Sequence, residues 1–189
     1  MKRLLALLIA FTMCLPLARF ALAEGSPRFY VEAPAEAAVG DTVTVRVSVS
    51  GEYEAHILNM RLNYNDKALE FVSLSRGPVL EAAATGMAIC EKAGDMPFIS
   101  VGILMYGSDG IKAEGMIFEA QFRVLGGASS VDLEIEVSEF GYLPLTATTA
   151  ENIEHTVENA ALKISGTGGG AVLTPAPTVM PIGGATEPA

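Results

Sequence analysis

The stretch from Ile57 to Phe71, ILNMRLNYNDKALEF, contains two apolar runs separated by a polar Asn65-Asp66 step. Residues of the first run alternate in type, because one parity is apolar and the other is mostly polar. Such alternation is typical of a strand with one buried face, since successive side chains point to opposite sides. We therefore predict a strand over 54–64. Its buried side chains are Leu58, Met60, Leu62 and Tyr64. Its outward side chains are Ile57, Asn59, Arg61 and Asn63.

The Asn65-Asp66 step could bind a metal or form a turn. Together with Asn63 it places oxygen ligands at loop spacing, but the Gly and the distal Glu of an EF-hand loop are missing. Asn and Asp side chains readily accept hydrogen bonds from nearby backbone N–H groups in turns. We therefore predict a turn between strands 54–64 and 68–74 rather than a calcium site.

The same period of two recurs through the middle of the chain, as in TVTVRVSVS from Thr42 to Ser50 and VDLEIEV from Val131 to Val137. A short helix is predicted over 78–85, which is rich in Ala, Leu and Glu. Many short strands without a helical period indicate an all-β sandwich, with a closed barrel as the alternative. About nine strands are predicted, near 28–33, 42–50, 54–64, 68–74, 87–92, 97–106, 114–125, 131–138 and 157–164.

Both ends of the chain differ from this middle part. Residues 1–23 combine basic residues, an apolar run and small residues before a cleavage site, which is the pattern of a secretory signal peptide cut after Ala23. From Gly166 onward the chain is rich in Gly, Thr, Pro and Ala, as linkers are. We expect a signal peptide over 1–23, one domain over 24–165, and a linker or tail over 166–189.

Removal of the signal peptide would leave an acidic chain with one cysteine. Nine basic residues would then face 22 acidic ones, a net charge of about −13 at neutral pH. This charge argues against nucleic acid or anionic lipid as a partner. With Cys14 removed, Cys90 has no partner for an intramolecular disulfide, and its apolar neighbours predict a buried thiol. We expect a secreted, extracellular domain that needs no cofactor.

Residues suited to catalysis or metal binding are sparse. His56 and His155 lack the ligand spacing of a zinc site, and the chain contains no GxSxG motif. The acids Asp132, Glu134 and Glu136 share one strand face, which is typical of a solvated side rather than of a pair of catalytic carboxylates. We therefore predict that the protein is not an enzyme.

Four motifs, taken together and in order, resemble those of cohesin modules. Val39-Gly40-Asp41-Thr42-Val43 resembles the start of an early cohesin strand, and LNYNDKALE from Leu62 to Glu70 resembles the YDPxxLE signature. EGMIFEAQFRV from Glu114 to Val124 resembles the DGxxxxxxFxV strand, and NAALKI from Asn159 to Ile164 resembles the final strand. The motifs cover nearly all of 28–165.

Two positions depart from the family pattern: Asn65-Asp66 replaces the usual Asp-Pro, and Ala160 replaces a frequent Gly. The resemblance implies a nine-stranded β-sandwich with jelly-roll topology. It also implies binding of a dockerin, a small calcium-loaded helical domain attached to secreted enzymes or scaffolds. The calcium would belong to the dockerin, so the cohesin itself would carry no metal.

The resemblance further implies where a dockerin would bind. In cohesins, the strands that correspond to 131–138, 54–64, 97–106 and 87–92 form one sheet, whose outer face meets a dockerin helix. Alternation in 97–106 buries Ile99, Val101, Ile103 and Met105 and leaves Ser100, Gly102, Leu104 and Tyr106 outward. The acids of 131–138 would form one margin. The candidate partner-binding residues are Ile57, Asn59, Arg61, Gly102, Leu104, Tyr106, Glu134, Leu143 and Leu145.

Two other functions stay open at the level of the sequence. Carbohydrate-binding modules of similar fold stack sugars on rows of aromatic side chains, whereas this chain has no Trp and its five Tyr residues are scattered. A structural spacer without a specific partner is the second alternative. Dockerin binding is favoured because the four motifs occur together and in the order of the family.

Overall fold

The computed structural model describes residues 25–107 and 109–166. The predicted signal peptide (1–23) and nearly all of the predicted tail (166–189) lie outside the described residues. No helix within the described part of the chain is long and apolar enough to span a membrane.

The described residues form twelve strands and one short helix, α2 (Pro78–Ala82). The strands are β1 (Arg28–Glu32), β2 (Glu36–Ala38), β3 (Thr42–Ser50), β4 (Ile57–Asn63), β5 (Leu69–Arg76), β6 (Met87–Lys92), β7 (Phe98–Leu104), β8 (Gly115–Val124), β9 (Ser130–Tyr142), β10 (Glu151–Asn152), β11 (Thr156–Glu158) and β12 (Ala160–Ser165).

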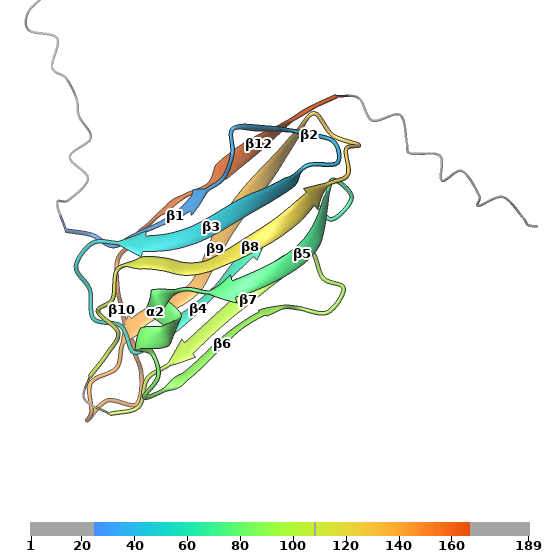
Figure 1. Ribbon diagram of the computed structural model, residues 1–189. Coiled ribbons are helices and arrows are strands. Elements are labelled where there is room, and N and C mark those ends of the chain that lie inside the picture. The colour runs from blue at the N-terminus through green and yellow to red at the C-terminus, as the bar shows by residue number, and fades with distance from the viewer. Residues whose placement is uncertain (1–24, 108, 167–189) are drawn as a thin grey trace, which may run out of the picture.

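These strands form two sheets that pack face to face (Figure 1). One sheet has the order β11-β1-β3-β8-β5, and the other has the order β2-β12-β9-β4-β7-β6 with β10 paired to β9. Most pairs are antiparallel, and the exceptions are β1 with β11 and β12 with β2. The predicted sandwich is thus confirmed, and the closed barrel is excluded because the strands separate into two sheets.

The core lies between the inner faces of the two sheets, as the period of two requires. Val43, Val45, Val47 and Val49 of β3 are all buried on one side of their strand. Phe29 and Phe140 meet edge to face with ring centroids 5.1 Å apart, and they join β1 of one sheet to β9 of the other. Burial of such apolar surface is the main stabilising contribution to a sandwich of this kind.

The Gly40-Asp41 turn explains one of the family-like motifs in physical terms. Gly40 has a φ of +96°, a left-handed conformation that favours glycine. Its N–H donates to the Val124 carbonyl at 2.8 Å, and the Asp41 carboxylate accepts the Ala38 N–H at 2.9 Å. The motif therefore fixes the entry into β3 beside the end of β8.

All nine predicted strands are present, but four details of the fold differ. Two short strands, β2 and β10, were not predicted, and β9 continues to Tyr142 instead of ending at 138. The predicted strand 157–164 divides into β11 and β12, which join different sheets. Asn159 lies at this division, where its side-chain Oδ1 accepts the Ile135 N–H at 2.9 Å. The helix ends at Ala82, earlier than predicted.

The predicted Asn65-Asp66 turn is also confirmed. Asn65 Oδ1 accepts the Lys67 N–H at 3.0 Å, and the Asn65 carbonyl accepts the N–H groups of Ala68 and Leu69. These are the bonds of an Asx-type turn, which uses the asparagine oxygen for the backbone. The turn links β4 in one sheet to β5 in the other.

Candidate functional site

The predicted order of four neighbouring strands is present in the larger sheet as β9-β4-β7-β6. The predicted parity also holds, because Leu58, Met60 and Leu62 of β4 are buried while Asn59 and Arg61 are exposed. In β7 and the residue after it, Ile99, Val101, Ile103 and Met105 are buried. We call the outer surface of these four strands the β4/β7 face.

Strand pairing arranges the outward side chains of this face in three parallel rows. The apolar row contains Gly141, Ile57, Leu104 and Met87. The middle row contains Glu139, Asn59, Gly102 and Ile89. The charged row contains Glu136, Arg61, Ser100 and Glu91. The face therefore changes from apolar to charged along the strand direction.

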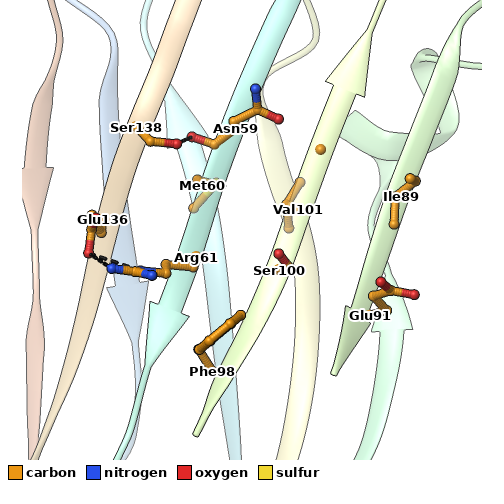
Figure 2. Close-up of a pocket in the computed structure, with 11 residues that line it drawn as sticks. Asn59, Met60, Arg61, Ile89, Glu91, Phe98, Ser100, Val101, Glu136 and Ser138 are labelled. Carbon is orange, nitrogen blue, oxygen red and sulfur yellow. Dashed lines mark hydrogen bonds and ion pairs between the residues drawn. The ribbon is translucent and has the colours of Figure 1, made fainter. Parts of the chain in front are cut away.

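An ion pair fixes the charged row beside β9. Both Arg61 Nε and Nη2 donate to Glu136 Oε2, at 2.9 and 2.6 Å, and the guanidinium lies 5.5 Å from the centre of the Phe98 ring (Figure 2). Both charged side chains are about half exposed, so solvent screening leaves the pair little effect on stability. Its consequence is positional, because the Arg61 side chain is directed across the face to β9 and its charge is paired with that of Glu136.

A β-bulge in β9 determines which residue of that strand lies in the middle row. The register between β4 and β9 shifts between Asn59 and Met60, so Asn59 faces Glu139 and Met60 faces Val137. Ser138 is the extra residue, and its hydroxyl donates to the Asn59 carbonyl at 3.1 Å. Because of this shift, Glu139 points outward and Phe140 enters the core.

The middle row is hollowed at Gly102. Two shallow depressions of about 390 and 340 Å³ lie on the face, and Asn59, Gly102 and Ile89 line both of them. Figure 2 shows Asn59 and Ile89 on either side of the strand that carries Ser100 and Val101. The depressions therefore meet over Gly102, where there is no side chain to fill them.

The structure brings five of the nine predicted residues together: Ile57, Asn59, Arg61, Gly102 and Leu104. Glu134 is on the same face but pairs with Asn63, one row beyond the charged row. The remaining three lie in segments that continue from the apolar row. Tyr106 follows Leu104 by two residues and is 63% exposed, and Leu143 follows Gly141 by two residues. Leu145 is 75% exposed.

Several residues of this face were not predicted. Met87 and Ile89 are exposed apolar side chains on the edge strand β6, and Glu91 follows them on the same side. Glu139 was missed as well, because the bulge at Ser138 interrupts the alternation. The available signal in the sequence of β6 was Glu91, a charged residue that shares the parity of Met87 and Ile89, because residues 87–90 are all apolar.

The groups whose pKa departs from its ordinary value lie away from the exposed side of this face. Burial raises the pKa of the Tyr53 hydroxyl, which donates to the Ala113 carbonyl, and burial also raises that of Tyr64. The Gly110 N–H and then Lys112 lower the pKa of Glu54. Burial raises the pKa of Cys90 to about 11, so this half-buried thiol is not an activated nucleophile.

Metal-binding side chains do not gather in the described residues, where no group of three or more His, Cys, Asp or Glu could hold an ion. His56 is buried, and both of its ring nitrogens lack a hydrogen-bond partner within residues 25–107 and 109–166. Its ring contacts that of Tyr142 edge to face at 5.0 Å.

Taken together, the described residues form a β-sandwich with a broad outer face on β9, β4, β7 and β6 that carries both apolar and acidic side chains. The sequence matches the family model of the cohesin domain over residues 31–164, so the chain belongs to the cohesin family. Cohesin domains are non-catalytic binding modules of extracellular cellulosome scaffolds. A comparison with curated proteins finds no significant match.

Solved structures of cohesins share this fold at low sequence identity. The seventh ScaB type I cohesin of Pseudobacteroides cellulosolvens is 19% identical with a TM-score of 0.60, and the match covers 75% of this chain and 94% of that one. The OlpC cohesin of Clostridium thermocellum, solved as a type I complex with the dockerin Doc435, is 17% identical with a TM-score of 0.58; the match covers 74% of this chain and 94% of that one. The OlpA cohesin of the same organism, in complex with Doc918, is 16% identical with a TM-score of 0.54, and the match covers 74% of this chain and 99% of that one.

Proposed function

We propose that this cohesin module binds a dockerin-bearing extracellular protein through the β4/β7 face. The observation that carries the proposal is the combination of an apolar row, a hollow at Gly102 and an acidic margin on four adjacent strands. Relatives of the same fold have been solved in complex with dockerins, which supports this class of partner.

The composition of the face fits a specific protein interface. Ile57, Leu104 and Met87 of the apolar row lie next to the amide of Asn59 and the carboxylate of Glu139 in the middle row. A specific interface likewise combines apolar contacts with polar groups at their margin. A specific interface typically buries about 800 Å² on each partner. The carboxylates would accelerate association with a basic surface and would select against acidic ones.

A direct binding measurement tests this function. The mature chain is immobilised, and dockerin modules encoded by the same genome are passed over it in calcium-containing buffer. At least one dockerin should bind, and Ile89→Asp should reduce its affinity by about tenfold or more, because a carboxylate would replace an exposed apolar contact. Val72→Asp is the matched control, since Val72 is an equally exposed apolar residue on β5 in the other sheet.

Two results would contradict the proposal. One is the absence of binding to every dockerin tested. The other is an equal loss of affinity in the Ile89→Asp and Val72→Asp variants, which would mean that the β4/β7 face has no special role. Retardation of the chain on cellulose or xylan gels, without dockerin binding, would favour a carbohydrate-binding module instead.

Calcium chelation tests which partner of the proposed complex carries the metal. Because the calcium would reside in the dockerin, EDTA should abolish binding while the melting temperature of the isolated cohesin stays unchanged. A fall in that melting temperature on chelation would place a metal in the cohesin and would overturn this part of the proposal.

We further propose that residues 1–23 direct secretion, that 24–165 is the folded module, and that 166–189 is a linker or tail. The support is the signal-peptide pattern at the N-terminus and the match of the family model within 24–165. Amino-terminal sequencing of the secreted chain should begin at Glu24. A start at Met1 would contradict the secretion signal.

A further inference from the structure

Gly102 lies at the centre of the β4/β7 face, where the two depressions meet. A Cβ atom built at this position would have one neighbour within 4 Å, the Oδ1 atom of Asn59 at 3.4 Å. The backbone here is ordinary strand, without the left-handed conformation that requires glycine. Neither crowding nor backbone strain therefore explains the glycine. Its effect is to leave an open depression between Asn59 and Ile89, which we call the Gly102 floor.

The walls of this floor differ in chemistry. Asn59 on β4 stands on one side and donates from Nδ2 to Glu139 Oε2 at 2.8 Å, which fixes its amide. Ile89 on the edge strand β6 stands on the other side and is 43% exposed. Leu104 and Met87 extend the apolar surface at one end of the floor. A side chain that enters here would therefore contact mainly aliphatic groups.

The charge at the other end of the floor is not neutralised. Glu91 pairs across β6 and β7 with Ser100, in the charged row, and it makes no ion pair within the described part of the chain. Arg61, the cation of this row, is engaged by Glu136 (Figure 2). Lys92 of β6 turns away from the row and bonds the carbonyls of Gly94 and Met96. The backbone of Glu91 thus lies about 7 Å along β6 from that of Ile89 in the middle row, the distance of two residues along a strand.

This spacing matches a feature of helices. Residues i and i+4 of a helix lie about 6 Å apart along its axis and on the same side. A helix laid along β7 can therefore place one side chain over Gly102 and another beside Glu91.

We propose that the Gly102 floor seats one aliphatic side chain of the dockerin helix, and that a lysine or arginine about one turn away on that helix pairs with Glu91. This inference rests on the proposed function and specifies the partner's chemistry at that site. It predicts that this cohesin selects dockerins with an aliphatic residue and a basic residue at i and i+4, and that it rejects those with an acidic residue at the second position.

The first test fills the floor without disturbing the fold. Gly102→Leu should weaken binding of the cognate dockerin by about 30-fold or more, the size of an interface hot spot. Gly102→Ala should weaken it by less than about fivefold, because the added methyl meets only Asn59 Oδ1 at an ordinary contact distance. Both variants should melt at or above the wild-type temperature, since glycine inside a strand is destabilising.

The second test reverses the charge. Glu91→Lys should weaken binding by about tenfold, and exchange of the partner's basic residue for glutamate should restore the lost affinity in the double variant. Glu70→Lys, at an exposed acid of β5 in the other sheet, is the matched control and should leave the affinity within twofold of wild type.

The outcomes distinguish the inference from the function on which it rests. If the wild-type chain binds no dockerin, the proposed function fails and the inference fails with it. If the wild-type chain binds but Gly102→Leu keeps full affinity, the floor is not the seat and only the inference is overturned. If Glu91→Lys and Glu70→Lys weaken binding equally, the effect is that of net charge, and the pairing with Glu91 is overturned.

Discussion

Asn59 of β4 donates a hydrogen bond from its side-chain Nδ2 to Oε2 of Glu139, 2.8 Å away on β9. The bond exists because Ser138 forms a β-bulge, which brings Glu139 rather than Ser138 opposite Asn59. The amide is therefore held in one orientation, with its Oδ1 directed toward Gly102. Because the Asn59 side chain is already ordered, it would lose less conformational entropy when a partner forms a hydrogen bond with its amide.

Removal of the Asn59 amide should weaken dockerin binding more than it weakens the fold. Asn59→Ala is expected to lower the affinity by about tenfold, because an oriented polar group at the centre of the face is lost. The free energy of unfolding should fall by less than about 1 kcal/mol, since the bond to Glu139 is exposed. Calorimetric titration and thermal melting measure the two effects. Asn63→Ala, at the far end of β4, is the control and should change neither quantity appreciably.

Much of this face follows from the sequence, because one residue type alternates with another in β4 and β7. Leu58, Met60 and Leu62 can be buried only if Asn59 and Arg61 point outward, so the parity was fixed once the strand was recognised. The apolar set of β7 constrains Gly102 and Leu104 in the same way. The sandwich fold followed from the repetition of this pattern in strand after strand.

The missed residues lie where the alternation carries less information. Met87, Ala88, Ile89 and Cys90 in β6 are all apolar, so their types do not say which two face the core. Strand pairing with β7 determines which of these side chains face the core, and that pairing involves residues in another segment of the chain. Glu139 follows the bulge at Ser138, which reverses the parity of β9 without any change in composition. The division of the last predicted strand at Asn159 likewise depends on partners in two different sheets.

Replacement of Glu54 by glutamine should make the melting temperature depend less on pH in the acid range. Glu54 accepts the Gly110 N–H at 3.2 Å and pairs with Lys112 at 3.1 Å, and these contacts lower its pKa below the usual 4.5. A carboxylate with a lowered folded-state pKa stabilises the fold above the unfolded-state value, and this contribution disappears as the pH falls through the lowered pKa. Wild type should therefore melt higher than Glu54→Gln at pH 7, and the difference should shrink below pH 4.5.

Melting curves recorded from pH 7 to pH 3 measure this effect. Glu52→Gln is a suitable control, because Glu52 is an exposed neighbour that makes no hydrogen bond with the described residues. A gap between wild type and Glu54→Gln that stays constant down to pH 3 would show that the carboxylate is not responsible.

Cys90 should react slowly with thiol reagents in the native protein. Burial raises its pKa to about 11 from the ordinary 9.0, so the thiolate fraction at pH 8 is about 100-fold below that of an unperturbed thiol. The rate of reaction with 5,5′-dithiobis(2-nitrobenzoate) should be lower than that of the urea-unfolded chain by at least about tenfold, and it should rise with pH up to about 11. A native rate equal to the unfolded one would mean that β6 exposes the thiol.

Replacement of His56 by phenylalanine should stabilise the fold. The imidazole is 1% exposed, and neither ring nitrogen has a hydrogen-bond partner among the described residues. Phenylalanine removes these two unpaired polar atoms and keeps an aromatic ring against Tyr142, whose centroid lies 5.0 Å away. Because an unsatisfied buried polar group costs about 1–3 kcal/mol, the free energy of unfolding should rise by about 1 kcal/mol after allowance for the larger ring.

Urea denaturation at pH 7.5 measures the change, with His155→Phe as the control because His155 Nδ1 already contacts the Ile153 carbonyl at 2.9 Å. A loss of stability in His56→Phe that equals or exceeds the loss in His155→Phe would show that the site has a partner for His56, such as a bound water, which phenylalanine cannot replace.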